Sequence, residues 1–294
     1  MMRDRVSPLS LLTYPYHRLQ PLTKGPSELR ALGREPGAAV VWSLEVGRYD
    51  PCANLVCDRP GGLSLIVVLP PAEEVSADPD IVSSIQRVRP HGILPHHPDL
   101  TPHDFAQVLR RPPSDLGGDV TDYLRWRGLG IDRDTAHVLR CIVDLSGELR
   151  SISAVSRGMY LSRRALGRRL LSRGLPVPSH WLQVARLLRV ILRLQNSEAT
   201  VSSIAFDLGY PDGFSVSNQM ERLIGFRPSD ARVRLGWEWV FEAWLRREAD
   251  RGGLAPTGVT GRMRPTCCPE PKLNPVETPG KRPRGAERAD RRGP

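Results

Sequence analysis

The stretch Pro178–Asn196, PSHWLQVARLLRVILRLQN, predicts the helix around which the rest of the chain is organised. Its apolar residues cover most of a helical cylinder, so we expect a helix that packs on several sides. These apolar residues are Trp181, Val184, Leu187, Leu188, Ile191, Leu192 and Leu194. One narrow stripe stays charged and holds Arg186, Arg189 and Arg193. We expect this stripe to face water or an anionic partner.

On the N-terminal side of this helix, Leu149–Gly174 has the pattern of a helix, a tight turn and a second helix. The residues expected on the buried faces are Ile152, Val155, Met159, Leu166 and Leu170. Ser162 is a natural N-cap for the second helix. Arg164 and Arg168 are four residues apart, so they share the outer face of that helix.

On the C-terminal side, Ala199–Phe226 has the same kind of pattern. Thr200 or Ser202 can cap the first helix. Gly209 suits the left-handed backbone that ends it, and Pro211–Gly213 supplies a turn and a restart. The residues expected to be buried are Ile204, Ala205, Leu208, Phe214, Val216 or Met220, and Leu223.

Two such units joined by one long helix resemble the DNA-binding domain of AraC-type transcription regulators. The strings that carry the resemblance are LSRRALGRRLLSRG from Leu161 and IAFDLGYPDGFSVSNQMERLIGFRPSDAR from Ile204. In the second string the matching positions are Ile204, Ala205, Leu208, Gly209, Tyr210, Gly225, Pro228 and Arg232. Many positions agree at fixed spacing, so no single glycine or charge carries the signal. The resemblance covers residues 136–235 and implies an all-α double helix-turn-helix domain.

The resemblance also implies which residues meet double-stranded DNA, because the second helix of each unit enters the major groove. The implied contacts are Arg163, Arg164, Gly167 and Arg168 in the first unit, and Gly213, Phe214, Ser215, Ser217, Asn218, Gln219 and Arg222 in the second. Candidates for the phosphate backbone are Ser162, Arg169, Arg173 and Arg186. Arginine can bond guanine bidentately, and asparagine or glutamine can read adenine. The alternative for the arginines is a solvated charged face.

The second unit departs from the family pattern at three positions. Asn218 stands where arginine is usual, and Met220 and Glu221 replace an aromatic residue and a lysine. We therefore expect the second unit to contact DNA more weakly or more selectively. The departure also supports an alternative function, a protein-interaction adaptor whose degenerate modules no longer read DNA specifically.

Residues 37–115 predict a small α/β module with a parallel sheet, because strand-like and helix-like runs alternate. The runs AAVVWSLEV, NLVC, GGLSLIVVLPP and HGILPHH predict strands, and DPDIVSSIQRVRP and TPHDFAQVLRRPP predict helices. The order is loosely similar to the receiver domains of two-component regulators. The third-strand candidate, however, ends at Val67–Pro71 without an aspartate, and no lysine lies between Lys24 and Lys272. The similarity is therefore to a degenerate receiver without phosphoryl switching.

The remaining segments flank these two modules. Residues 1–36 are predicted to be a flexible lead-in, and residues 253–294 a disordered basic tail. Residues 116–135 would form a helical connector. Residues 236–252 predict a C-terminal amphipathic helix, on which an aromatic stripe is more often a packing face than a ligand site. The stripe consists of Trp237, Val240, Phe241 and Trp244.

Composition narrows the function further. The chain has 294 residues, a formal net charge of +10 and few lysines. An arginine-rich surface suits phosphate and guanine, although a GC-rich genome gives the same bias. No secretion signal and no apolar run of the ~20 residues that a membrane span needs is present, so we expect a cytoplasmic protein without membrane contact.

Other chemistries find little support. The histidine group His91, His96, His97 and His103 has spacing that can bind zinc or nickel, but the prolines around it favour an irregular loop. No phosphate-binding loop, dinucleotide motif or nucleophile motif occurs, so we expect neither an enzyme nor a cofactor. The sequence predicts a bacterial, sequence-specific transcription regulator. Its expected partners are DNA, RNA polymerase and a second copy of the chain.

Overall fold

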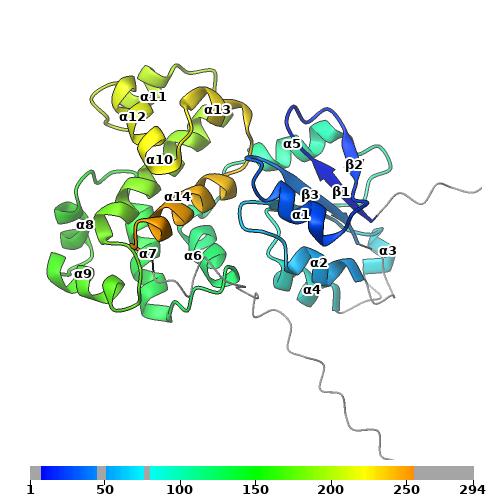
Figure 1. Ribbon diagram of the computed structural model, residues 1–294, viewed down its shortest axis with the longest axis horizontal. Coiled ribbons are helices and arrows are strands. Elements are labelled where there is room, and N and C mark those ends of the chain that lie inside the picture. The colour runs from blue at the N-terminus through cyan, green and yellow to red at the C-terminus, as the bar shows by residue number, and fades with distance from the viewer. Residues whose placement is uncertain (1–7, 45–50, 76–79, 255–294) are drawn as a thin grey trace, which may run out of the picture.

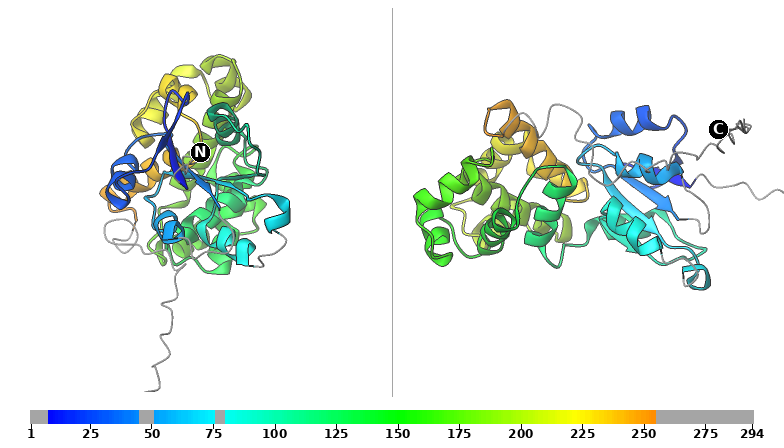
Figure 2. Two further views of the ribbon diagram at one scale, coloured as in Figure 1. Left: turned by 90° about the vertical axis from the view of Figure 1, so that its right-hand side faces the viewer. Right: turned by 90° about the horizontal axis from the view of Figure 1, so that it is seen from below.

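The computed structural model describes residues 8–44, 51–75 and 80–254, which fold into two lobes (Figure 1). The N-terminal lobe is an α/β region built on a five-stranded mixed sheet, and the C-terminal lobe is helical. Figure 2, in its view from below, shows the lobes side by side. They meet where helices α6 (Leu116–Trp126) and α14 (Glu238–Asp250) approach the sheet lobe. The predicted order of an α/β module followed by a helical domain is confirmed at this level.

The sheet has the strand order β2-β1-β3-β4-β5. Its strands are β1 (Leu9–Leu12), β2 (Leu19–Pro21), β3 (Ala39–Ser43), β4 (Ser64–Val68) and β5 (Gly92–Leu94). β3, β4 and β5 run parallel to one another, whereas β1 pairs antiparallel with both β2 and β3. The sheet is therefore mixed, because an N-terminal hairpin extends the predicted parallel part.

Helices cover both faces of this sheet, so the strands carry apolar side chains on both sides. α1 (Pro26–Leu32), α2 (Pro51–Cys57) and α4 (Asp80–Val88) pack against one face, and α5 (Pro102–Arg110) against the other. A short helix, α3 (Ala72–Val75), follows β4. Successive strand residues point to opposite faces. The first core holds Leu9, Leu11, Val40, Trp42, Leu65 and Val67, and the second holds Leu12, Ala39, Val41, Ile66 and Val68.

Two predictions for this lobe are wrong. The lead-in predicted for residues 1–36 contains β1, β2 and α1, and every residue of β1 is buried. Strands this short show no sustained period, because their burial depends on pairing with β3, which is distant in sequence. The run NLVC belongs to helix α2, since a short apolar run does not distinguish a buried strand from a buried helix. Residues 1–7 and 255–294, which include most of the predicted tail, lie outside the described residues.

The helical lobe is built around α10, which spans Pro178–Asn196 as predicted. The helices before it are α7 (Arg133–Leu145), α8 (Ile152–Gly158) and α9 (Arg163–Leu171). The helices after it are α11 (Val201–Asp207), α12 (Gly213–Ile224) and α13 (Pro228–Val233). α10 contacts each of these helices, and also α5 and α14. Its packing on several sides is therefore confirmed, and one apolar cluster runs through the whole lobe.

The aromatic stripe on α14 is a packing face, as predicted. Trp237, Phe241 and Trp244 are at most 2% exposed, and Val240 is fully buried. Their rings contact Tyr123 of α6 and a tryptophan of α10. α14 therefore ties the helical lobe together from within.

Candidate nucleic-acid interface

The helix pairs α8–α9 and α11–α12 have the same turn at the level of backbone hydrogen bonds. The Leu161 N–H donates to the Ser156 carbonyl at 2.9 Å, and the Tyr210 N–H donates to the Ala205 carbonyl at 2.8 Å. The two preceding N–H groups in each turn also donate to carbonyls at equivalent positions of the first helix. They belong to Met159 and Tyr160 in the first pair and to Leu208 and Gly209 in the second. The two pairs are thus a structural repeat, which the sequence showed only as a similarity of pattern.

The left-handed residue of each turn occupies the same place in the repeat. Gly209 has a φ of +70°, and Tyr160 has a φ of +55°. Only glycine adopts this conformation without strain, so the first turn is built against local preference. The Tyr160 side chain is 97% exposed. A lone tyrosine in a turn gives no sequence signal of its backbone angle, so Tyr160 is not predictable as the left-handed residue.

Each second helix begins at a side-chain cap. Ser162 accepts a hydrogen bond from the Ala165 N–H at 3.1 Å, which confirms it as the N-cap of α9. Asp212 accepts one from the Ser215 N–H at 2.6 Å, so it is the N-cap of α12. Both caps leave the remaining first-turn N–H groups pointing away from the helix. The start of α9, whose cap is a neutral serine, therefore attracts anions, whereas the Asp212 carboxylate already supplies the negative charge at the start of α12.

The outer side chains of α9 are free within the described part of the chain. Arg163, Arg164 and Arg168 are exposed, and none makes a hydrogen bond or ion pair with a described residue. Gly167 lies between them on the helix surface, with open space where a side chain would be. The buried side of the helix is held by Leu166 and Leu170, as predicted. α9 therefore presents unneutralised positive charge.

The outer face of α12 is chemically different. Asn218 is exposed and Gln219 half-buried, and neither side chain bonds to a described residue. Arg222 is held by Gln183 of α10 at 3.3 Å. The Ser217 hydroxyl donates to the Gly213 carbonyl at 2.9 Å. This face is polar, and the charge of Arg222 on it lies next to the opposite charge of the exposed Glu221.

Phe214 is 73% exposed, so its predicted burial is wrong. It follows Gly213, which packs so closely on the preceding helix that an added Cβ would lie 2.9 Å from the Ser202 hydroxyl oxygen. Val216 takes the inward position instead and is 1% exposed. Gly213 is needed for this close approach, whereas Phe214 is turned outward with Asn218.

Three of the four phosphate candidates are already engaged inside the protein. Arg169 pairs with Asp134 at 3.7 Å, and Arg173 pairs with Asp132, the N-cap of α7. The Arg186 guanidinium donates to a carbonyl that follows α11 and lies over the Tyr210 ring, 4.6 Å from its centroid. These three arginines bind other helices of the lobe. The fourth candidate, Ser162, bonds only to the first turn of its own helix.

The charged stripe of α10 does not simply face solvent, so that prediction is wrong for two of its members. Arg186 donates to the Leu208 carbonyl at 2.9 Å, and Arg189 donates to the Val143 carbonyl at 2.9 Å. Burial lowers the pKa of Arg189. Carbonyls at helix ends carry partial negative charge, which attracts these cations. Arg186 therefore fixes the α11–α12 pair to α10, and Arg189 fixes the C-terminal end of α7 to it.

Two adjoining cavities lie along one side of α10. The larger, of about 650 Å³, is lined by outer residues of α12, including Ser215, Asn218 and Gln219. The other, of about 500 Å³, is lined by Arg163 and Arg164 of α9. Both cavities share Ile152 and Ser179. The outer faces of α9 and α12 therefore open on the same side of the lobe.

Sequence reasoning missed several residues that line the larger cavity. Arg150 reaches over the second turn, where a Cβ on Gly209 would lie 2.1 Å from its guanidinium carbon. Gln183 and Tyr210 line the same cavity. Arg150 precedes the N-cap of α8, so no helical period marked it. Only the packing of the two helix pairs brings these residues together.

The histidine group is dispersed. His91 bonds to Glu238, and His103 contacts Gln107 on α5. His97 accepts a hydrogen bond from the Asp99 N–H, and His96 is exposed. Within the residues that the structure describes, no three His, Cys, Asp or Glu side chains gather as metal ligands would.

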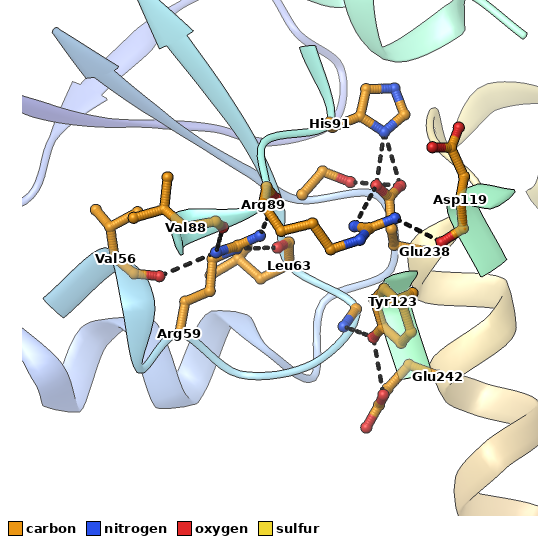
Figure 3. A network of polar contacts seen from close by, with 12 residues as sticks. Val56, Arg59, Leu63, Val88, Arg89, His91, Asp119, Tyr123, Glu238 and Glu242 are labelled. Atoms are coloured by element: carbon orange, nitrogen blue, oxygen red, sulfur yellow. Dashed lines mark hydrogen bonds and ion pairs between the residues drawn. The ribbon is translucent and has the colours of Figure 1, made fainter. Parts of the chain in front are cut away.

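A buried polar network joins the two lobes (Figure 3). Glu238, at the first turn of α14, is 2% exposed. It accepts hydrogen bonds from His91 Nδ1 at 2.7 Å and from the Ser64 hydroxyl at 3.0 Å. Arg89 lies 3.6 Å from the same carboxylate and donates to the Asp119 carbonyl at 3.0 Å. One carboxylate thus holds β4, β5 and α14 together.

A second carboxylate one helical turn later makes a similar junction. Glu242 accepts hydrogen bonds from the Tyr123 hydroxyl at 2.8 Å and from Arg127 at 2.8 and 3.0 Å. The Tyr123 oxygen in turn accepts a hydrogen bond from the Gly62 N–H at 2.8 Å. Burial raises the pKa of Tyr123 well above 10.0, so it stays a neutral donor to Glu242. The Tyr123 hydroxyl therefore links Glu242 of the helical lobe to Gly62 of the α/β lobe.

The network contains serine, histidine and glutamate, yet its order does not suit nucleophilic catalysis. Ser64 and His91 both donate to Glu238, whereas an activated serine needs the histidine as its base. Burial would raise the pKa of Glu238, but the charges of His91 and Arg89 outweigh it and lower the pKa to about 2. Glu238 is therefore a fixed anion that pairs with cations. Its hydrogen bonds join the α/β lobe to α14.

Comparisons with known proteins add no assignment. No family model matches the chain, and no curated protein matches it. Across the described ranges, no helix has the length and apolarity that crossing a membrane requires.

Proposed function

We propose that this protein is a transcription regulator that binds a specific site on double-stranded DNA, with α9 and α12 in successive major grooves. The observation that carries the proposal is the structural repeat, whose two second helices open on the same side of α10. α10 has 19 residues and is about 28 Å long, which suits recognition helices held about one DNA turn, roughly 34 Å, apart.

Electrostatics supports the same proposal. The chain carries a formal net charge of +10, and Arg163, Arg164 and Arg168 are unneutralised on one helix face. Phosphate oxygens would accept hydrogen bonds from such arginines and from the free N–H groups at the start of α9. Affinity should then fall steeply with salt, because phosphate contacts release counterions.

The proposal extends to the setting of the protein. It would act in the cytoplasm without a cofactor and without enzymatic activity, with RNA polymerase or a second copy of the chain as further partners. β4 ends at Val68 and is followed by Leu69 and Pro70, so no carboxylate is available there for phosphoryl transfer. Glu238 and Glu242 are among the contacts through which an input to the α/β lobe would reach the helical lobe, together with Arg246, which donates to the Gly33 and Gly61 carbonyls.

The test is selection of bound duplexes from random DNA, followed by gel-shift titration with Arg164→Ala and Arg168→Ala. Both variants should weaken binding to the selected site by roughly 5- to 150-fold and relax its sequence. Arg87→Ala is the matched control, because Arg87 is an exposed arginine on α4 without a bond to any described residue. Selection that enriches no sequence above background would refute the proposal.

The second candidate is a protein-interaction adaptor. The exposed rings of Tyr160, Phe206 and Phe214 favour it, being 97%, 82% and 73% exposed. An adaptor would bind DNA only in a salt-sensitive, sequence-independent way, and Arg164→Ala and Arg168→Ala would weaken every fragment equally. The selection experiment therefore separates the two functions.

A further inference from the structure

The structural repeat pairs each outer residue of α9 with one of α12. The N-caps Ser162 and Asp212 are equivalent, since each accepts a hydrogen bond from the N–H three residues later. Counting from the caps pairs the buried residues Leu166 with Val216, and Leu170 with Met220. Between the shared turn and the N-cap, the second unit has one residue more than the first. The pairing of outer residues therefore has to be counted from the caps.

The same count pairs Arg164 with Phe214 and Arg168 with Asn218. All four side chains are exposed, and neither arginine nor the asparagine bonds to any described residue. They lie in the first two turns of their helices, the part of a recognition helix that reaches the base edges. The two units thus present different chemistry at the same two places.

We infer that the protein reads a composite site, with guanine in the half-site under α9 and an A·T pair in the half-site under α12. This inference rests on the proposed function. In the major groove, guanine offers two acceptors that suit arginine, and adenine offers one acceptor and one donor that suit asparagine. Arg164 and Arg168 therefore select guanine, and Asn218 selects adenine.

Phe214 adds an apolar contact to the second half-site. The ring is 73% exposed at a position where the first unit carries a charged arginine. The thymine methyl group is the apolar feature of the major-groove edge, and phenylalanine can pack against it. Asn218, one helical turn further along the same face, would read the adenine of that pair or of a neighbouring one.

The balance of charge separates the two halves as well. α9 has three unneutralised arginines, whereas α12 has one exposed arginine, Arg222, next to the exposed negative charge of Glu221. The salt dependence of binding should therefore come mainly from the first half-site. The second half-site contributes through base contacts.

The experiment is random-duplex selection with the full chain and with two exchange variants, Arg168→Asn and Asn218→Arg. The wild type should enrich a guanine half and an A·T half about ten base pairs apart, centre to centre. Arg168→Asn should lose guanine in the first half only, and Asn218→Arg should replace adenine with guanine in the second half only. Each exchange should change affinity for the wild-type site by roughly 5- to 150-fold.

A thymine-to-uracil probe tests Phe214 separately, because it removes only the methyl group. Wild type should bind the uracil probe several-fold more weakly than the thymine probe, and Phe214→Ala should bind both equally. Circular dichroism spectra and melting temperatures of all variants establish that each one is folded.

The outcomes separate this inference from the proposed function. Enrichment of no sequence would overturn both. Enrichment of a site with two halves of the same base composition, or a preference that ignores the exchanges, would overturn the composite site and leave specific DNA binding intact. Equal loss of affinity for uracil probes in wild type and Phe214→Ala would overturn the methyl contact.

Discussion

Glu238 accepts a hydrogen bond from His91 Nδ1 at 2.7 Å across the boundary between the two lobes. The carboxylate belongs to the last helix of the structure and the imidazole to the segment just before β5 (Figure 3). Both side chains are at most 5% exposed. A contact between residues 147 positions apart therefore helps to hold the α/β lobe against the helical lobe.

Replacing Glu238 with glutamine should destabilise the whole protein. Arg89 and His91 would then lie buried without their counter-ion, which costs about 3–5 kcal/mol. The melting temperature should fall by roughly 10 °C. Differential scanning calorimetry measures it, with Glu198→Gln as the control, because Glu198 is exposed and unpaired among the described residues. A fall no larger than that of the control would contradict the role of Glu238.

The same pair predicts a pH dependence. Burial alone would lower the pKa of His91, but the charge and hydrogen bond of Glu238 raise it above 6.5, so its contribution is complete below pH 6.5 and declines as the pH rises through the raised value. Glu238 has a pKa lowered from 4.5 to about 2, so its contribution is complete above pH 4.5 and declines as the pH falls towards 2. The coupling should be strongest between pH 4.5 and 6.5.

The measurement is the difference in melting temperature between wild type and His91→Gln across pH 3 to 9. Two other charged groups face the same cluster: Arg89 and half-buried Asp119, whose pKa is raised by burial. Wild type and His91→Gln both retain these two groups. A difference that stays constant from pH 5 to pH 9 would show that His91 is neutral in the folded protein.

Arg189→Met should lower stability, because Arg189 supplies hydrogen bonds to the Ser146 hydroxyl and to the Val143 and Asp144 carbonyls. Hydrogen bonds from a charged donor contribute about 2 kcal/mol, so we expect the melting temperature to fall by about 4–8 °C. Arg193→Met is the matched control, since Arg193 is exposed and lies 3.8 Å from Asp207. If both variants melted at the same temperature, the capping role of Arg189 would be excluded.

Substitutions of the left-handed residues Tyr160 and Gly209 should have different effects on the melting temperature. Tyr160→Gly should raise the melting temperature slightly or leave it unchanged, because Tyr160 occupies a left-handed conformation with its side chain in solvent. Gly209→Ala should lower it, because the new methyl group would meet the Arg150 guanidinium at a φ of +70°. Thermal unfolding of both variants tests the equivalence of the turns. A gain of stability in Gly209→Ala would disprove it.

Local pattern predicted the elements of the helical lobe well. The apolar period located α10 at its observed bounds, and Ser162 and Thr200 are the caps that their positions indicated. These features depend on neighbours within four residues along the chain, so the sequence carries them directly. The same holds for α4 and α5, and for the aromatic face of α14.

The sequence by itself determined the helices on either side of α10 and which side chains of α9 could meet an anion. Only the tertiary structure decided that Arg186 and Arg189 bond to helix ends, that Phe214 turns outward, and that β1 joins the sheet. In each case the deciding partner is distant along the chain or is a backbone atom. Periodicity records which side of an element is buried, but it does not record what that side meets.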